Sequence, residues 1–173
     1  MRKLLLVVAL VFLMAGVISA AEPAARAFLV NAQGERIGEA MFEETPSGVK
    51  VSLKVSKLTP GPHAFHIHSV GSCQPPDFKS AGPHFNPTRK KHGRQNPEGP
   101  HAGDLPDLRV GKDGTGKTEI LVTGVTLSGA AENSLFHPGG TALVIHASPD
   151  DNKTDPAGSA GDRIACGIIQ PSK

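Results

Sequence analysis

Short segments in which apolar and polar side chains alternate, separated by turn residues, constrain the fold of this chain more than any other feature. Residues 49–55 are the clearest example, because Val49, Val51, Leu53 and Val55 alternate with lysines and serines. A period of two is typical of a strand with one buried face. Further strands are expected at 28–30, 39–44, 64–68, 118–123, 141–146 and 164–169. These segments favour a protein built from β-sheets.

Turn-forming residues separate the expected strands. They occur at Gln33-Gly34, Pro46-Ser47-Gly48, Pro60-Gly61-Pro62, Asp113-Gly114 and Pro138-Gly139-Gly140. Many short strands with regular turns predict an all-β sandwich or barrel. Two stretches, 69–106 and 148–162, are long, polar or rich in Pro and Gly, and lack this pattern. Loops of this length in a small domain are usually functional or disordered. The first contains three histidines and Cys73, which a disordered segment would not need, so we expect two long functional loops.

The first 20 residues have the three-part pattern of a secretory signal peptide. A cationic head, Met1 to Lys3, precedes an apolar run from Leu4 to Val17 and the small residues around Ala20. The alternative is a membrane anchor, but the run is shorter than the roughly 20 apolar residues that a spanning helix needs. We expect a signal peptide at 1–20 and a single domain at 21–173. The mature chain would then be free of the membrane and secreted, with the periplasm favoured over the extracellular space.

The net charge of the chain gives no support for a nucleic-acid partner. The formal net charge of +2 includes Arg2 and Lys3, so loss of the signal leaves the chain near neutral. The basic cluster at 89–91 also fits a nucleic-acid or heparin site. We interpret it as a solvated loop, because an exported chain bypasses the nucleus and no aromatic residues interleave with the cations.

The two cysteines, Cys73 and Cys166, fit an oxidising compartment. An even number in an exported chain most simply forms one disulfide, and two cysteines allow one intramolecular pairing. The alternative is a pair of inert buried thiols. In the chain-entropy model, closing a loop this long stabilises the fold by about 4–5 kcal/mol.

Eight histidines are present, and their placement indicates metal binding. His66 and His68 are two residues apart on an expected strand, so their side chains lie on one face. The other candidate ligands are His84, His92, His101 and Asp104 in the first long stretch and His146 at the end of 141–146. Imidazole suits copper and zinc alike, and one carboxylate added to histidines is a common zinc set. These ligands exceed what one tetrahedral ion needs, which indicates two ions or a shared ligand.

Five motifs, in order and spacing from about Ala27 to Ile169, resemble the copper–zinc superoxide dismutase family. They are Phe65-His66-Ile67-His68, Gly71-Ser72-Cys73, Gly82-Pro83-His84-Phe85-Asn86-Pro87, His101-Ala102-Gly103-Asp104-Leu105 and Arg163-Ile164-Ala165-Cys166-Gly167. The resemblance implies an Ig-like Greek-key β-sandwich or flattened barrel. It also implies an oxidoreductase that disproportionates superoxide to dioxygen and hydrogen peroxide, in antioxidant defence outside the cytoplasm.

The same resemblance implies one copper and one zinc ion in each chain. It assigns to copper the ligands His66, His68, His84 and His146. It assigns to zinc the ligands His84, His92, His101 and Asp104, so His84 would bridge the two ions.

Further roles follow from the resemblance alone. His84 would supply a proton during catalysis, and Arg163 would dock the anionic substrate beside the copper. Asp150 matches the aspartate that links a copper histidine to a zinc histidine, with the adjacent Asp151 as the alternative. The cysteine pair matches the disulfide that ties the first long loop to the last strand. Lys153 is the best candidate for a charge that guides the substrate.

Two histidines, His63 and His137, match no ligand, and we interpret them as structural or solvent-exposed. Two other hypotheses are a metal-carrying module on the same fold and an adhesive sandwich with incidental histidines. The first would be expected to lack a ligand or the arginine, and the second does not explain why polar clusters fall at ligand positions. The sequence leaves open whether the chain is a monomer or a homodimer.

Overall fold

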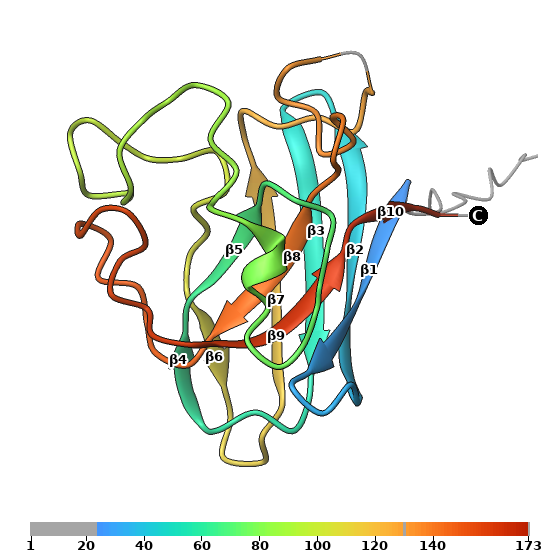
Figure 1. Ribbon diagram of the computed structural model, residues 1–173, viewed down its shortest axis with the longest axis vertical. Coiled ribbons are helices and arrows are strands. Elements are labelled where there is room, and N and C mark those ends of the chain that lie inside the picture. The colour runs from blue at the N-terminus through green and yellow to red at the C-terminus, as the bar shows by residue number, and fades with distance from the viewer. Residues whose placement is uncertain (1–23, 130, 173) are drawn as a thin grey trace, which may run out of the picture.

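One antiparallel sheet dominates the computed structural model, which describes residues 24–129 and 131–172 (Figure 1). Its strands are β1 (Ala25–Asn31), β2 (Arg36–Thr45), β3 (Gly48–Val55), β4 (Gly61–His63), β5 (Phe65–His68), β6 (Leu108–Val110), β7 (Gly116–Val122), β8 (Ala142–His146), β9 (Arg163–Ile168) and β10 (Gln170–Pro171). The helical element in these ranges is a short 3-10 turn, η1 (Lys79–Ala81). None of the described residues forms a helix long and apolar enough to span a membrane. The signal peptide expected at 1–20 lies outside the described residues.

The sheet is almost closed on itself. Its strand order is β4-β6-β7-β3-β2-β1-β9-β8-β5, with β10 beside β1. The two outer strands, β4 and β5, are consecutive in the chain and separated only by Ala64, so the backbone itself joins the two edges. Because β7 and β6 lie between β3 and β4 in space, the connection is of the Greek-key type. The predicted all-β Greek-key sandwich or flattened barrel is confirmed, in the form of a nearly closed barrel.

The predicted alternation in β3 places its apolar side chains in the core. Val49, Val51 and Leu53 are fully buried, whereas the lysines and serines between them are at least partly exposed. Each fully buried aliphatic side chain contributes about 1.5–3 kcal/mol relative to its exposed state. The other predicted strands coincide with β1, β2, β5, β7, β8 and β9.

Strand β5 differs, because all four of its residues are buried. Phe65 and Ile67 belong to the barrel core, and His66 and His68 lie on the opposite face of the strand. Both histidines are nevertheless fully buried. The long loops therefore cover the outer face of this part of the barrel.

Three short strands were not predicted. Gly61 and Pro62, expected in a turn, lie in β4. Proline is tolerated there because β4 is an edge strand that pairs only with β6, so its missing N–H breaks no ladder. Strands β6 and β10 contain three and two residues, too few for an alternation to be recognised.

Both predicted long loops are present. The first loop, residues 69–107, joins β5 to β6, and the second loop, residues 147–162, joins β8 to β9. They lie on the same side of the barrel (Figure 1) and are hydrogen-bonded to each other. The amide of His92 donates to the Asp155 carboxylate at 2.7 Å, and the Gln95 amide donates to the Asn152 carbonyl at 3.1 Å. A third long connection, 123–141, was not predicted.

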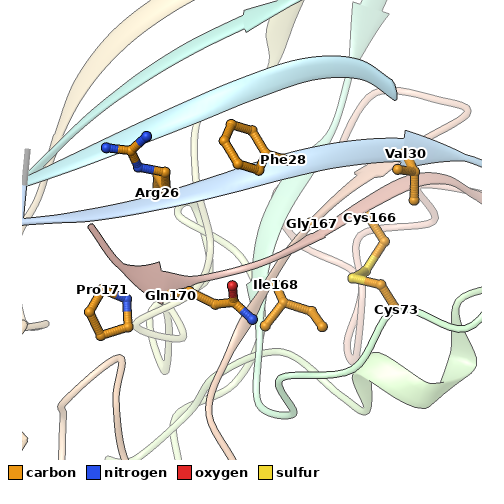
Figure 2. A pocket seen from close by; sticks show the side chains of 9 residues that line it. All are labelled: Arg26, Phe28, Val30, Cys73, Cys166, Gly167, Ile168, Gln170 and Pro171. Carbon is orange, nitrogen blue, oxygen red and sulfur yellow. A yellow bond between two sulfur atoms is a disulfide. The ribbon is translucent and has the colours of Figure 1, made fainter. Parts of the chain in front are cut away.

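The predicted disulfide between Cys73 and Cys166 is confirmed. It ties the first loop to β9, at the wall of a cavity of about 490 Å³ that Phe28 and Val30 also line (Figure 2). Cys166 lies in a small apolar cluster with Phe78, Ala81, Ala142 and Val144. This cluster seats η1 against the outer face of β8 and β9.

We expect the double substitution Cys73→Ser and Cys166→Ser to lower the free energy of unfolding of the metal-free protein by about 4–5 kcal/mol. The two residues are 93 positions apart, so their bond removes much conformational freedom from the unfolded chain. Urea denaturation of the variant, with chemically reduced wild type as the control, measures the loss. A loss below about 1 kcal/mol would contradict the chain-entropy argument.

Candidate metal centre

Four buried imidazole nitrogens converge between β5, β8 and the first loop. They are His66 Nδ1, His68 Nε2, His84 Nε2 and His146 Nε2, and none has a hydrogen-bond partner among the described residues. These four residues offer ligand atoms that all lie within 4.8 Å of one another. An unsatisfied buried polar group costs about 1–3 kcal/mol. Four such nitrogens that converge on one point therefore indicate a binding site for a ligand that satisfies them all.

In three of these rings, the hydrogen bond made by the other ring nitrogen determines the tautomer. His68 Nδ1 donates to the Gly82 carbonyl at 2.8 Å, and His146 Nδ1 donates to the Gly161 carbonyl at 3.3 Å. His66 Nε2 donates to the Asp150 carboxylate at 2.9 Å. A neutral imidazole that donates from one nitrogen has its lone pair on the other. The converging nitrogens therefore present lone pairs, as a copper ion requires.

A second set surrounds one oxygen of Asp104. The Nδ1 atoms of His84, His92 and His101 lie 2.9, 3.0 and 3.2 Å from Asp104 Oδ1. His84 Nδ1 and His101 Nδ1 are 3.5 Å apart. Ligand atoms on a tetrahedron with bonds of about 2.0–2.1 Å lie roughly 3.3 Å from one another. Three imidazoles and one carboxylate at these separations fit zinc.

His84 belongs to both sets because its two ring nitrogens face opposite ways. Its Nε2 joins the first set and its Nδ1 joins the second. The first loop places it there by pairing with β5, through isolated bridges between His68 and His84 and between His66 and Asp104. In this way two distant segments of one irregular loop are held in register with a strand.

Gly103 makes this double pairing possible. Its carbonyl accepts from the Ile67 amide at 3.0 Å, and its amide donates to the Phe85 carbonyl at 2.9 Å. A Cβ at this position would collide with the Ile67 carbonyl oxygen and approach the Phe85 nitrogen. The residue between His101 and Asp104 must therefore be small enough for β5 to touch its backbone.

The charges of the cluster suit cation binding. Burial lowers the pKa of His84 to about 4 and that of His146 to about 3, and the nearby His66 ring adds to both shifts. Burial also lowers the pKa of His68 well below its usual value. For Asp104, burial opposes ionisation, but hydrogen bonds from His101 and His84 outweigh it and keep the pKa well below the usual range. Neutral imidazoles and an ionised carboxylate are the forms that bind metal.

Asp150 connects the two sets. Its Oδ2 accepts from His66 Nε2 at 2.9 Å, and its Oδ1 accepts from His92 Nε2 at 3.0 Å. Burial raises the pKa of Asp150, but these two hydrogen bonds outweigh burial and lower it overall. The neighbouring Asp151 is exposed and accepts instead from the amides of Lys153 and Thr154.

Arg163 is half-buried and its guanidinium is fixed by two backbone carbonyls. Nη1 donates to Phe78 and Nη2 to Gly82, each at 2.8 Å. The residue pairs with His146 in the register between β8 and β9, which brings it beside the first set. It also lines a cavity of about 510 Å³ together with Asp77, Lys79 and Asp162. A rigid cation at the edge of the cluster can bind a small anion.

Comparison with known proteins identifies the family. The family model for copper/zinc superoxide dismutase (SODC) matches residues 36–169. The chain belongs to this family. Superoxide dismutase (Cu-Zn) 1 of Aquifex aeolicus is 55% identical over 143 residues, which cover 82% of this chain and 85% of that protein.

Other members give the same result. Superoxide dismutase (Cu-Zn) of Caulobacter vibrioides is 42% identical over 148 residues, covering 84% of this chain and 85% of the relative. The crystal structure of a SOD-like protein from Bacillus subtilis has a TM-score of 0.80 and 38% identity, and the match covers 83% of this chain and 96% of that one. Family membership confirms the predicted family and enzyme class, an oxidoreductase of the superoxide dismutase type.

Two histidines, His63 and His137, belong to neither set of candidate ligands, and their contacts differ from each other. His63 is buried, and its ring nitrogens lie 2.8 Å from the carbonyl oxygens of Thr59 and His146. His137 stacks on Phe85, with ring centroids 5.3 Å apart. Lys153 is exposed on the second loop.

Sequence reasoning did not identify the backbone groups that position the site. The Gly82 carbonyl accepts from both His68 and Arg163, and Gly103 anchors the loop to β5. The only sign of these contacts in the sequence is the glycine that each of the two histidine motifs contains.

We expect Gly103→Ala to lower the free energy of unfolding of the metal-free protein by about 1–3 kcal/mol, because the added Cβ forces the loop away from β5. Zinc content after reconstitution should fall as well, since His84 and Asp104 lose their register. Denaturation curves and metal analysis measure both effects. Gly129→Ala is the matched control, because a Cβ there meets nothing within 4 Å. Equal behaviour of the two variants would refute the role of Gly103.

Proposed function

We propose that this chain is a secreted superoxide dismutase that holds one copper and one zinc ion and converts superoxide to dioxygen and hydrogen peroxide. The observation that carries the proposal is the convergence of four buried, unpartnered ring nitrogens beside a zinc-type set, with His84 in both. A sandwich with incidental histidines would have no reason to bury these nitrogens unsatisfied.

Each ion has its own ligands in this proposal. Copper would be held by His66 Nδ1, His68 Nε2, His84 Nε2 and His146 Nε2. Zinc would be held by His84 Nδ1, His92 Nδ1, His101 Nδ1 and Asp104 Oδ1. Bound copper supplies the redox chemistry, since it changes between two oxidation states, whereas zinc has none.

His84 is the proposed proton carrier. Reduction of superoxide to hydrogen peroxide consumes two protons, so a donor beside the reacting oxygen is needed. The Nδ1 side of His84 is held by the set around Asp104, which fixes the ring while its Nε2 faces the four-histidine set. Nε2 has a single lone pair, so it would carry the proton only while it is not a copper ligand, and it would then present that proton toward the other three histidines of the set.

Arg163 is the proposed docking cation for superoxide. The mature chain is near neutral, so attraction of an anion has to come from local charge. Two carbonyls hold the guanidinium, which therefore needs no reordering when the anion arrives. Asp150 would keep the copper and zinc rings in a fixed relation, because it bonds to His66 and His92 at once.

We also propose that residues 1–20 direct export and that residues 21–173 form the single mature domain. The signal pattern and the disulfide are both typical of proteins outside the cytoplasm. The periplasm is the proposed destination, with the extracellular space as the alternative.

Metal reconstitution tests the function. Protein loaded with copper and zinc should remove superoxide, protein loaded with zinc alone should not, and metal analysis should give one ion of each per chain. Loss of activity on copper removal and its return on copper addition complete the test. A fully loaded protein without dismutase activity would favour a metal-carrying module instead.

We expect His146→Ala to abolish dismutase activity while zinc stays bound, because His146 belongs to the four-histidine set and not to the set around Asp104. Activity and metal content are measured on the same reconstituted sample. His137→Ala is the control, since His137 belongs to neither set, and it should keep activity. Loss of zinc from the His146 variant would contradict the proposed division of ligands.

We expect Arg163→Glu to slow superoxide removal by about tenfold or more, because it replaces the docking cation with an anion. Copper and zinc content should not change, since Arg163 contacts carbonyls and no ligand atom. Arg109→Glu makes the same charge change on the exposed face of β6 and should have a much smaller effect. Equal rates for the two variants would remove Arg163 from the mechanism.

A further inference from the structure

A cleft between the two long loops contains cations that the proposed dismutase chemistry does not use. It has a volume of about 480 Å³. Three consecutive cations of the first loop, Arg89, Lys90 and Lys91, line it, and Asp155 of the second loop lies among them. His84 and His101 also line the cleft, although they are only 6% and 8% exposed. The cleft therefore extends from an exposed basic rim to the edge of the candidate metal centre.

Hydrogen bonds fix the backbone of the segment that carries these three cations. Arg89 is in the left-handed conformation, with φ of 53°, which is uncommon for a residue other than glycine. The Asn86 side chain accepts from the Lys90 amide at 2.9 Å and donates to the Lys90 carbonyl at 2.8 Å. The Lys91 amide donates to the Glu98 carbonyl at 2.9 Å. In an extended segment successive side chains would point to opposite sides, whereas all three residues of this turn line one cleft.

Most of this positive charge is not neutralised within the described residues. Lys91 lies 3.7 Å from Asp155, but that carboxylate also accepts from the His92 amide. Arg89 and Lys90 have no carboxylate within 4.0 Å in the described part of the chain. Lys50 on β3 is an example of a neutralised cation, since its ammonium lies 2.8 Å from the Glu43 carboxylate. The cleft thus combines a fixed backbone, a concave shape and excess positive charge.

We propose that this cleft is a binding site for a phosphate-type oxyanion. A guanidinium and two ammonium groups offer charge-assisted hydrogen bonds to several oxygens at once. A divalent anion is favoured over a monovalent one, because three cations outnumber the single carboxylate of Asp155 and the net attraction grows with the charge of the anion. Tyrosine and tryptophan are absent from the chain and no phenylalanine is among the residues that line the cleft, so it has none of the large aromatic side chains on which successive bases stack in single-stranded nucleic acid sites.

The cleft is separate from the cavity beside Arg163. That cavity is lined by Arg163, Lys79 and Asp77, none of which lines the cleft. Superoxide docking and oxyanion binding are therefore assigned to different cations. Variants at each place can distinguish the two sites.

Calorimetric titration of the copper- and zinc-loaded protein with inorganic phosphate at low ionic strength tests the proposal. The double variant Arg89→Gln and Lys90→Gln should bind phosphate about tenfold more weakly or worse, because two charge-assisted contacts are lost. Lys112→Gln with Lys117→Gln removes the same charge from exposed positions near the β6–β7 turn and in β7. That control should keep wild-type affinity, and Arg163→Gln should keep the phosphate-binding step that the double variant weakens, since Arg163 does not line the cleft. Titration with glycerol phosphate shows whether the cleft accepts a phosphate monoester as well as the free ion.

Three results would overturn the proposal. They are the absence of measurable phosphate binding by the wild type at millimolar phosphate, unchanged affinity in the double variant, and a loss that follows Arg163 or the control pair. The single variant Lys90→Gln repeats the test if the double variant does not fold, since its backbone contacts with Asn86 do not involve the side chain of Lys90. Phosphate binding is measured independently of superoxide removal, so its failure is distinguishable from failure of the dismutase function.

Discussion

The lone pairs of buried imidazoles on the outer face of β5 determine how the rest of the molecule is arranged. His66 and His68 are carried by a strand whose other face is barrel core, so their positions are as fixed as those of Phe65 and Ile67. Both rings are fully buried, yet each has one nitrogen without a hydrogen-bond partner among the described residues. Such an arrangement is unfavourable unless something else satisfies these atoms. The covering loops, the carboxylates and the glycines all follow from this requirement.

The covering loops are positioned by backbone contacts more than by side-chain packing. The first loop pairs with β5 twice, near His84 and near Asp104, and is tied to β9 by the disulfide. The carbonyl of Gly82 links this loop to both His68 and Arg163. The disulfide and the carbonyls that hold the candidate docking cation thus belong to the same loop. The small apolar cluster around Phe78 keeps η1, and hence these carbonyls, against the barrel.

Periodicity in the sequence predicted the barrel strands well, because burial on one face leaves an alternation that can be read residue by residue, as in β3. It failed for β4, where Pro62 resembled a turn, and for the very short β6 and β10. The spacing of His66 and His68 also predicted a shared face. An irregular loop has no period, so the meeting of His84, His92 and His101 came from family resemblance alone. The contact of His63 with the His146 carbonyl and the roles of Gly82 and Gly103 involve backbone atoms, which leave little trace in the sequence.

The two candidate ion sites are distributed unequally over the chain. Three of the four residues proposed for copper lie on strands β5 and β8, whereas all four proposed for zinc lie in the first loop. The zinc set spans only the stretch from His84 to Asp104, a separation of 20 residues. Copper binding would therefore depend mainly on the folded barrel. Zinc binding would depend mainly on the conformation of one segment of the first loop. The ion that is missing from a partly loaded sample would then distinguish a disrupted barrel, which lowers copper binding, from a displaced first loop, which lowers zinc binding.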